Sequence, residues 1–108
     1  MKTKGKKRAH PPRACDFTRQ FHKDWQRLDR SGRFDMGCLK QVMMLIVTND
    51  APLGPEWRDH ALVGDWADHR ECHVGGDFLL IYRVDDNVGK SGMVVFVRAG
   101  THAELFRE

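Results

Sequence analysis

The sequence lacks any long hydrophobic run. Its longest apolar stretch, Val42 to Val47, has six residues, whereas a helix that spans a bilayer needs about 20. The N-terminus is basic, but no apolar segment of roughly 7 to 15 residues follows it, as a secretory signal requires. Both absences argue against a membrane-spanning or exported protein, and we expect a cytoplasmic one.

Cysteine is scarce and shows no pairing pattern. The three cysteines, Cys15, Cys38 and Cys72, are odd in number and widely spaced, which is typical of reduced thiols and not of a disulfide framework. We expect them to act as small hydrophobic side chains. With 108 residues and 41% hydrophobic content, the chain fits one domain with one modest core.

Close spacing of metal ligands is also missing. His69 and His73 fall on one face of a predicted strand, but residues four apart along a strand lie about 13 Å apart, too far to share one zinc ion. His69 and Cys72 would point to opposite faces. Glycine-rich phosphate loops and nucleophile elbows are absent from the sequence. We therefore expect no tight ligand pair, no metal and no cofactor.

Acidic residues are absent before Asp16. Six of the 18 cations precede it: Lys2, Lys4, Lys6, Lys7, Arg8 and Arg13. Residues 14–108 hold the other 12 cations against 15 acids, a formal charge of −3, so the pI of 8.9 reflects the tail. We predict a disordered tail over residues 1–13 and a folded domain over residues 14–108. The tail is either an arm that contacts phosphates or an extension without a role.

Two helices are predicted in the first half of the chain. Apolar residues recur at helical spacing between residues 17 and 30: Phe17, Phe21, Trp25 and Leu28. Thr18 is a suitable N-cap for this helix, and Ser31-Gly32 ends it. Asp35 can cap a second helix that closes at residues 49–52. Residues 14–17 can form a short strand, which the preceding prolines confine to a sheet edge or keep outside the sheet.

Three strands are predicted in the second half. They cover residues 70–74, 77–84 and 93–98, with a tight turn at Gly75-Gly76 and a polar loop over residues 85–92. Residues 79–82 are apolar at consecutive positions, so both faces of that strand should be covered, and it belongs in the middle of the sheet. Thr101 can cap a short C-terminal turn or helix that reaches Phe106.

Histidines occur where these strands begin or end, with carboxylates and aromatic residues beside them. Imidazole has an unperturbed pKa of about 6.5, which suits it to donate and accept protons near neutrality. His60, His73 and His102, if they meet in one cleft, can supply the base for a ribose 2′-hydroxyl and the acid for the departing 5′-oxygen of RNA. Which histidine takes which role stays open.

Other residues can complete such a site. Arg98, four residues before His102, can face the phosphate, because a guanidinium matches phosphate oxygens. Asp77 is better suited to orient a histidine than to act as the base, since an ordinary aspartate has a pKa of about 3.9. Phe78 and Phe106 can stack on unpaired bases.

Several sequence blocks carry a family resemblance. They are Arg58-Asp59-His60 with Leu62 and Gly64, Arg70-Glu71-Cys72-His73 with Asp77, Leu79-Leu80-Ile81-Tyr82, Arg98-Ala99-Gly100-Thr101-His102, and Leu105-Phe106. In order and spacing, from about residue 17 to 106, they resemble YafQ-type toxins of the RelE superfamily.

The resemblance implies an α+β, RelE-like microbial ribonuclease fold. Its order is βααβββ, with an N-terminal helical hairpin packed on a mainly antiparallel sheet and a short C-terminal helix. By this resemblance, the functional positions of the family correspond in this chain to His60, His73, Asp77, Phe78, His102 and Phe106. The family commonly has Trp at Phe78 and often Thr at Ala99, and its folded part is usually strongly basic.

The resemblance also implies an activity and partners. It points to a ribosome-dependent endoribonuclease toxin that cleaves mRNA in the ribosomal A site by metal-independent attack of the 2′-hydroxyl. Ribosomal RNA, mRNA and a cognate antitoxin would be its partners, with no membrane, and with operator DNA only through the antitoxin. The acidic body keeps an alternative open, a non-catalytic module of the same fold that binds antitoxin or RNA without cleavage.

Overall fold

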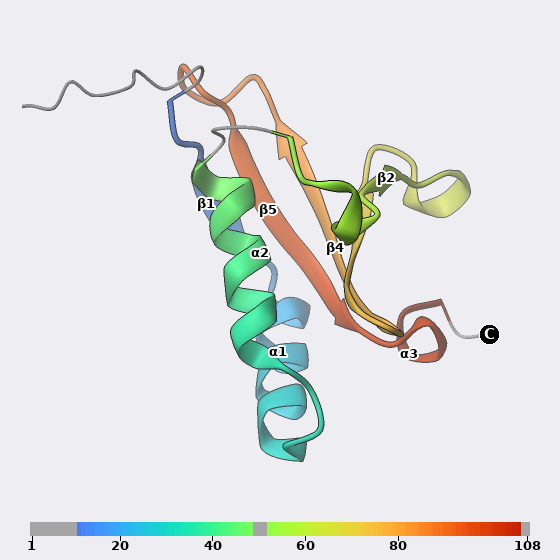
Figure 1. Ribbon diagram of the computed structural model, residues 1–108. Helices are drawn as coiled ribbons and strands as arrows, with labels where there is room; N and C mark the ends of the chain where they lie inside the picture. The colour runs from blue at the N-terminus through green and yellow to red at the C-terminus, as the bar shows by residue number, and fades with distance from the viewer. Residues whose placement is uncertain (1–10, 49–51, 107–108) are drawn as a thin grey trace, which may run out of the picture.

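A helical hairpin covers one face of a five-stranded sheet (Figure 1). The computed structural model describes residues 11–48 and 52–106, so most of the predicted tail, residues 1–10, lies outside the described part. Arg13, the last residue of the predicted tail, contacts the folded part: its backbone N–H and guanidinium donate to the carbonyls of Val47 and Ile46 at 2.9 and 2.7 Å. None of the described helices is long and apolar enough to cross a membrane.

The two predicted helices are confirmed, together with their N-caps, while most of the predicted end of the second helix, residues 49–51, lies outside the described part. Helix α1 spans Arg19–Ser31, and the Thr18 hydroxyl accepts the Phe21 N–H at 2.9 Å. Gly32 ends α1 in the left-handed conformation, with φ of 70°, which glycine adopts without a steric penalty. Helix α2 spans Met36–Thr48, and the Asp35 carboxylate accepts the Cys38 N–H at 2.9 Å.

The sheet has the order β1-β5-β4-β3-β2. Strand β1 (Ala14–Phe17) lies at one edge, parallel to β5 (Met93–Gly100), and the other pairs are antiparallel. Strand β4 (Phe78–Asp85) is central, as its consecutive apolar residues predicted, and β3 (Arg70–Gly75) lies beside it. The mainly antiparallel α+β arrangement is therefore confirmed.

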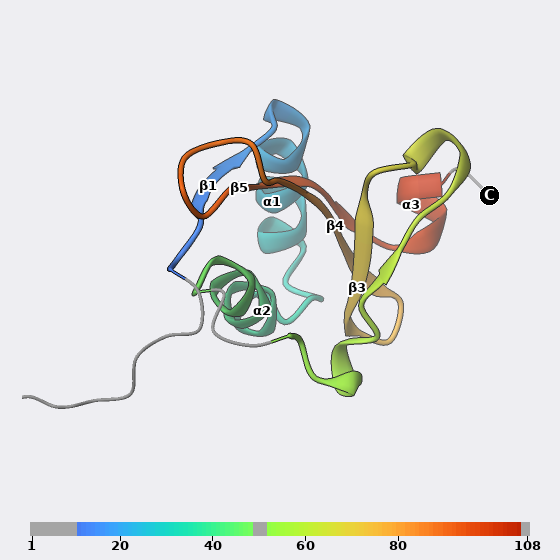
Figure 2. The same ribbon diagram turned by 90° about the horizontal axis from the view of Figure 1, so that it is seen from above.

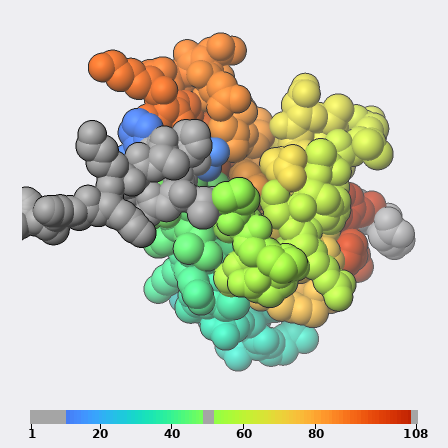
Figure 3. Space-filling view, turned by 45° about the horizontal axis from the view of Figure 1, so that its top comes forward, coloured from blue at the N-terminus to red at the C-terminus, as the bar shows by residue number. Residues whose placement is uncertain are grey.

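The segment between α2 and β3 was not predicted from the sequence. It holds a two-residue edge strand, β2 (His60–Ala61), between two short 3-10 turns, η1 (Pro55–Trp57) and η2 (Gly64–Trp66). Two residues are too few to show the alternation that reveals a strand. In Figure 3 this segment, drawn in light green to yellow, forms a lobe on the surface near the end of the chain.

The two faces of the sheet carry separate hydrophobic clusters. The larger cluster lies under α1 and α2 and includes Leu28, Val42, Leu80 and Phe96. The smaller one lies on the opposite face, where Leu79, Ile81 and Leu105 are buried. Leu105 belongs to α3 (His102–Phe106), which lies apart from the α1–α2 hairpin (Figure 2). The candidate site lies on this second face, which the hairpin does not cover.

A buried carboxylate joins α1 to β5. The Asp24 side chain is fully buried, and its oxygens accept from Arg98 Nε and Nη2 at 2.8 and 3.1 Å, from Arg27 Nη1 at 2.9 Å and from the Ala99 N–H at 3.1 Å. Burial raises the pKa of Asp24, but the hydrogen bonds from Arg98 and Arg27 outweigh it and leave the pKa below its usual value.

We expect Asp24→Asn to lower the free energy of unfolding at neutral pH by about 3 kcal/mol, because it leaves a partly buried guanidinium without its charged partner. The pKa of Asp24 is depressed in the folded state, so its contribution is full above about pH 4 and is lost as the pH falls through the depressed value. Urea denaturation at pH 7 and pH 3 should show a smaller loss on acidification for the variant. Equal losses would contradict this assignment.

Candidate active site

The face of the sheet opposite the helical hairpin carries the predicted histidines. In β3, Glu71 and His73 are two residues apart and share this face, because side chains alternate along a strand. The register of β2 places His60 directly opposite Glu71. His102 is the first residue of α3 and comes to the same place from the end of β5.

The three imidazoles form a row. The ring centroids of His60 and His73 are 6.1 Å apart, and those of His73 and His102 are also 6.1 Å apart. Three separate stretches of backbone therefore bring together the three rings that the sequence suggested. His60 and His102 are exposed and His73 is half-buried, so a ligand on this face can reach all three.

Glu71 joins two members of the row. Its Oε2 atom lies 3.3 Å from His73 Nε2 and 3.7 Å from His60 Nε2, and its side chain is buried. The backbone carbonyl of Arg58 accepts from His60 Nδ1 at 2.8 Å, which turns Nε2 of that ring toward the carboxylate. We gave Glu71 no role from the sequence; its alternation with His73 along the strand was the available signal.

Asp77 holds the third histidine. Its Oδ1 atom accepts from the His102 backbone N–H at 3.0 Å and from His102 Nδ1 at 2.6 Å. These two hydrogen bonds keep the pKa of Asp77 below its ordinary value, so the carboxylate is ionised near neutrality. Because Nδ1 is occupied, the Nε2 atom of His102 is left to face a substrate.

Comparison with known proteins identifies the family. A family model described as "Bacterial toxin of type II toxin-antitoxin system, YafQ" matches residues 13–107, which include every residue of the site. The chain belongs to the YafQ toxin family.

Three relatives illustrate the similarity. The mRNA interferase toxin YafQ of Escherichia coli K12 is 37% identical over 94 residues, covering 87% of this chain and 96% of that toxin. The crystal structure of the Escherichia coli DinJ-YafQ complex is 37% identical with a TM-score of 0.75, covering 87% of this chain and 98% of that one. The metal-bound toxin from Helicobacter pylori is 35% identical with a TM-score of 0.74, covering 86% and 98%. These structures support the RelE-like fold predicted from the sequence.

The aromatic residues at the YafQ family positions differ in their surroundings. Phe106 is half-buried, and its ring lies 6.0 Å from His102 and 6.1 Å from Trp66, at the end of the imidazole row. Phe78 is buried on the other face, 4.9 Å from the Phe34 ring. Phe106 is therefore placed where a base can stack near the row, whereas Phe78 is packed in the larger core.

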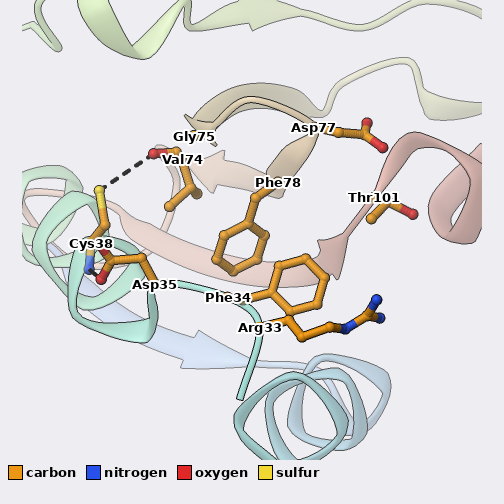
Figure 4. A pocket seen from close by; sticks show the side chains of 9 residues that line it. All are labelled: Arg33, Phe34, Asp35, Cys38, Val74, Gly75, Asp77, Phe78 and Thr101. Atoms are coloured by element: carbon orange, nitrogen blue, oxygen red, sulfur yellow. Dashed lines mark hydrogen bonds between the residues drawn. The ribbon is translucent and has the colours of Figure 1, made fainter. Parts of the chain in front are cut away.

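A cavity of about 300 Å³ lies next to Phe78. Figure 4 shows the rings of Phe78 and Phe34 side by side in it, with Arg33 at one side and Asp77 and Thr101 at another. The same Asp77 holds His102. The cavity is therefore lined by Asp77, which holds His102, but not by the three imidazole rings.

Arg98 is held within the fold. Its guanidinium makes two hydrogen bonds to buried Asp24, so the side chain that we expected at the phosphate has a structural partner on α1. Its contact with RNA stays a prediction, and any such contact has to compete with this ion pair.

The expectation that no ligand pair is close enough for a metal ion is wrong. One ligand atom each from His60, Glu71 and His73 lie within 4.8 Å of one another. The sequence argument considered ligands on a single strand, whereas these come from two neighbouring strands in register. Around a zinc ion at 2.0–2.2 Å from each ligand, such atoms are about 3.4 Å apart, so a small adjustment of the side chains would complete three ligands.

We expect added Zn²⁺ to bind this chain at His60, Glu71 and His73 and to raise its melting temperature, with the chelator EDTA reversing the shift. Because the ion occupies side chains that the metal-independent reaction proposed below requires, it should inhibit the toxin and not activate it. Glu71→Gln should weaken binding in calorimetry by about 10-fold or more, because a charged ligand becomes neutral. The matched control is Glu56→Gln, the same change at an exposed glutamate in η1. Equal Zn²⁺ affinity for both variants would place the ion elsewhere.

Proposed function

We propose that this YafQ family toxin is an endoribonuclease that cleaves mRNA in the ribosomal A site without a metal ion. The observation that carries the proposal is the row of three imidazoles, each within 6.1 Å of the next, on the open face of the sheet. The relative from Escherichia coli K12 is named an mRNA interferase toxin. Because ribosomes and mRNA are the proposed targets, we place the toxin in the cytoplasm.

His102 is the proposed general acid. Asp77 accepts from its Nδ1 atom and, being ionised, stabilises positive charge on the ring. The exposed Nε2 atom can then donate a proton to the departing 5′-oxygen as the bond from phosphorus to that oxygen breaks. The same positive charge faces the negative charge that develops on the phosphate oxygens.

His73 and Glu71 are the proposed proton acceptors. The 2′-hydroxyl loses its proton to this pair while its oxygen forms a bond to phosphorus. At phosphorus, the bond to the 2′-oxygen forms as the bond to the 5′-oxygen breaks. The products are a 2′,3′-cyclic phosphate and a 5′-hydroxyl. Glu71 lies 3.3 Å from His73 Nε2 but 3.7 Å from His60 Nε2, beyond hydrogen-bond distance, so we propose that His60 Nε2 turns from Glu71 to a phosphate oxygen when RNA binds.

Substrate and antitoxin contacts complete the proposal. Phe106, beside His102, is the proposed stacking platform for a base, an interaction worth about 1–3 kcal/mol. Arg98 and Phe78 are weaker candidates for RNA contact, because the first is paired with Asp24 and the second is buried. The relative YafQ was crystallised with DinJ, and we propose that a cognate antitoxin likewise binds and neutralises this chain.

We expect His102→Ala to abolish growth arrest and to lower the rate of mRNA cleavage by about 100-fold or more, the scale of a lost general acid. The matched control is His22→Ala, which removes an exposed imidazole on α1, near Phe17. It should arrest growth like the wild type. Mapping of transcript 5′ ends after brief expression measures the cleavage, and thermal unfolding checks that both variants fold.

The outcomes separate the candidate functions. Cuts at codon-spaced positions in the wild type and none in His102→Ala support the enzyme. Growth arrest by the wild type without cuts supports the non-catalytic module that the acidic body kept open. Full toxicity of folded His102→Ala would remove His102 from the mechanism.

A further inference from the structure

The helix that carries His102 is too short to hold itself in place. Helix α3 has five residues, whereas isolated helices below about 12–15 residues are marginal in water. Its position therefore depends on contacts with the rest of the fold. Leu105 packs into the smaller core, and Asp77 binds the backbone and the ring of His102.

A capping box organises the first turn of α3. The Thr101 hydroxyl accepts the Glu104 N–H at 3.2 Å, and the Glu104 carboxylate accepts the Thr101 N–H at 2.9 Å. This reciprocal pair satisfies two backbone donors that the start of a helix otherwise leaves without partners. His102 stands between these two residues, so the box determines where its backbone lies.

A line of charges connects this capping box to the core. The same Glu104 oxygen that binds Thr101 also accepts from Arg27 Nη2 at 3.2 Å. The other end of the Arg27 guanidinium binds buried Asp24 at 2.9 Å, and Asp24 in turn binds the Ala99 N–H near the end of β5. Helix α1 is thus linked to the first turn of α3 by the Arg27–Glu104 ion pair, while a second ion pair, within α1, joins Arg27 to Asp24.

Gly100 makes room for this link. A Cβ atom at that position would lie 2.5 Å from the Glu104 carboxylate oxygen and 3.2 Å from Arg27 Nη2. A side chain at residue 100 would therefore displace the carboxylate. The close approach of Glu104 to the backbone is a built feature of the junction between β5 and α3.

We propose that Arg27 and Glu104 are positioning residues for His102. They touch neither the imidazole row nor its two carboxylates in the described structure, and they act by fixing the turn from which His102 projects toward His73. The consequence for catalysis rests on the proposed function, because it requires His102 to take part in cleavage. Misplacing a catalytic group by about 1 Å can cost roughly 100-fold in rate.

The test compares Arg27→Met and Glu104→Ala with Arg30→Met. Arg30 is an exposed arginine in the last turn of the same helix, with no ion pair among residues 11–48 and 52–106. Glu104→Gln is the conservative variant, because its amide oxygen can still accept from Thr101 and Arg27. Three quantities are measured on the full chain: the NMR signals of the His102 ring, hydrogen exchange of the Leu105 amide, which donates to Thr101, and single-turnover cleavage of mRNA on ribosomes.

We expect Arg27→Met and Glu104→Ala to shift the His102 ring signals, to speed exchange of the Leu105 amide, and to lower the cleavage rate by about 10-fold at an unchanged half-saturating concentration. Arg30→Met and Glu104→Gln should stay near the wild type. The double variant Arg27→Met with Glu104→Ala should cleave no more slowly than Glu104→Ala alone, because both changes break one link. If Arg27→Met fails to fold, Glu104→Ala still tests the proposal, because it removes the partner of Arg27 on α3.

Two results would overturn the proposal. The first is slower cleavage with unchanged ring signals and exchange, which would indicate direct contact of Arg27 with RNA. The second is unchanged cleavage in an active toxin, whatever happens to the ring. A wild type that cuts no RNA, with ring signals and exchange altered in the variants, would refute the proposed function and leave the structural link to His102 standing.

Discussion

The alternation of side chains along β3 is the constraint on which the site depends. Cys72 points under the helical hairpin, where burial raises the pKa of its thiol to about 12. Glu71 and His73, its neighbours, point to the open face. A one-residue slip of register would bury the imidazole and expose the thiol. In the observed register Leu80 is opposite Cys72 and Leu79 is opposite His73, and both leucines are fully buried, one on each face of the sheet.

The two carboxylates of the site are held in opposite ways. Glu71 is buried on the sheet, where its carboxylate lies between the imidazoles of His60 on β2 and His73 on β3. Asp77 is exposed in the turn between β3 and β4 and accepts from both the backbone and the ring of His102. A buried carboxylate and an exposed one at the two ends of an imidazole row make the ends chemically different, which is what a reaction with one base and one acid requires.

Much of the fold could be predicted from the sequence, because its signals are local. Thr18, Asp35 and Thr101 cap the helices at which they were expected, since a cap depends on residues three positions away. Asp24 gave no such signal: a carboxylate on an apolar stripe makes sense only beside Arg98, 74 residues further along the chain. The metal-capable cluster also needed cross-strand register, which the sequence does not show. The convergence of the three histidines could be predicted only from the order and spacing of several sequence blocks that resemble the family.

The net charge of residues 14–108 explains why the proposed site suits an mRNA that the ribosome presents. Residues 14–108 carry more acids than cations, and three arginines of the sheet and of α1 are engaged by carboxylates: Arg70 by Asp59, Arg98 by Asp24, and Arg27 by Asp24 and Glu104. In the proposed reaction, positive charge at the scissile phosphate then comes mainly from imidazoles. Phosphate contacts supply most of the affinity for free nucleic acid, so the folded body alone is poorly equipped to capture RNA from solution. In the proposed reaction the ribosome supplies that positioning, and the imidazole row has only to move protons.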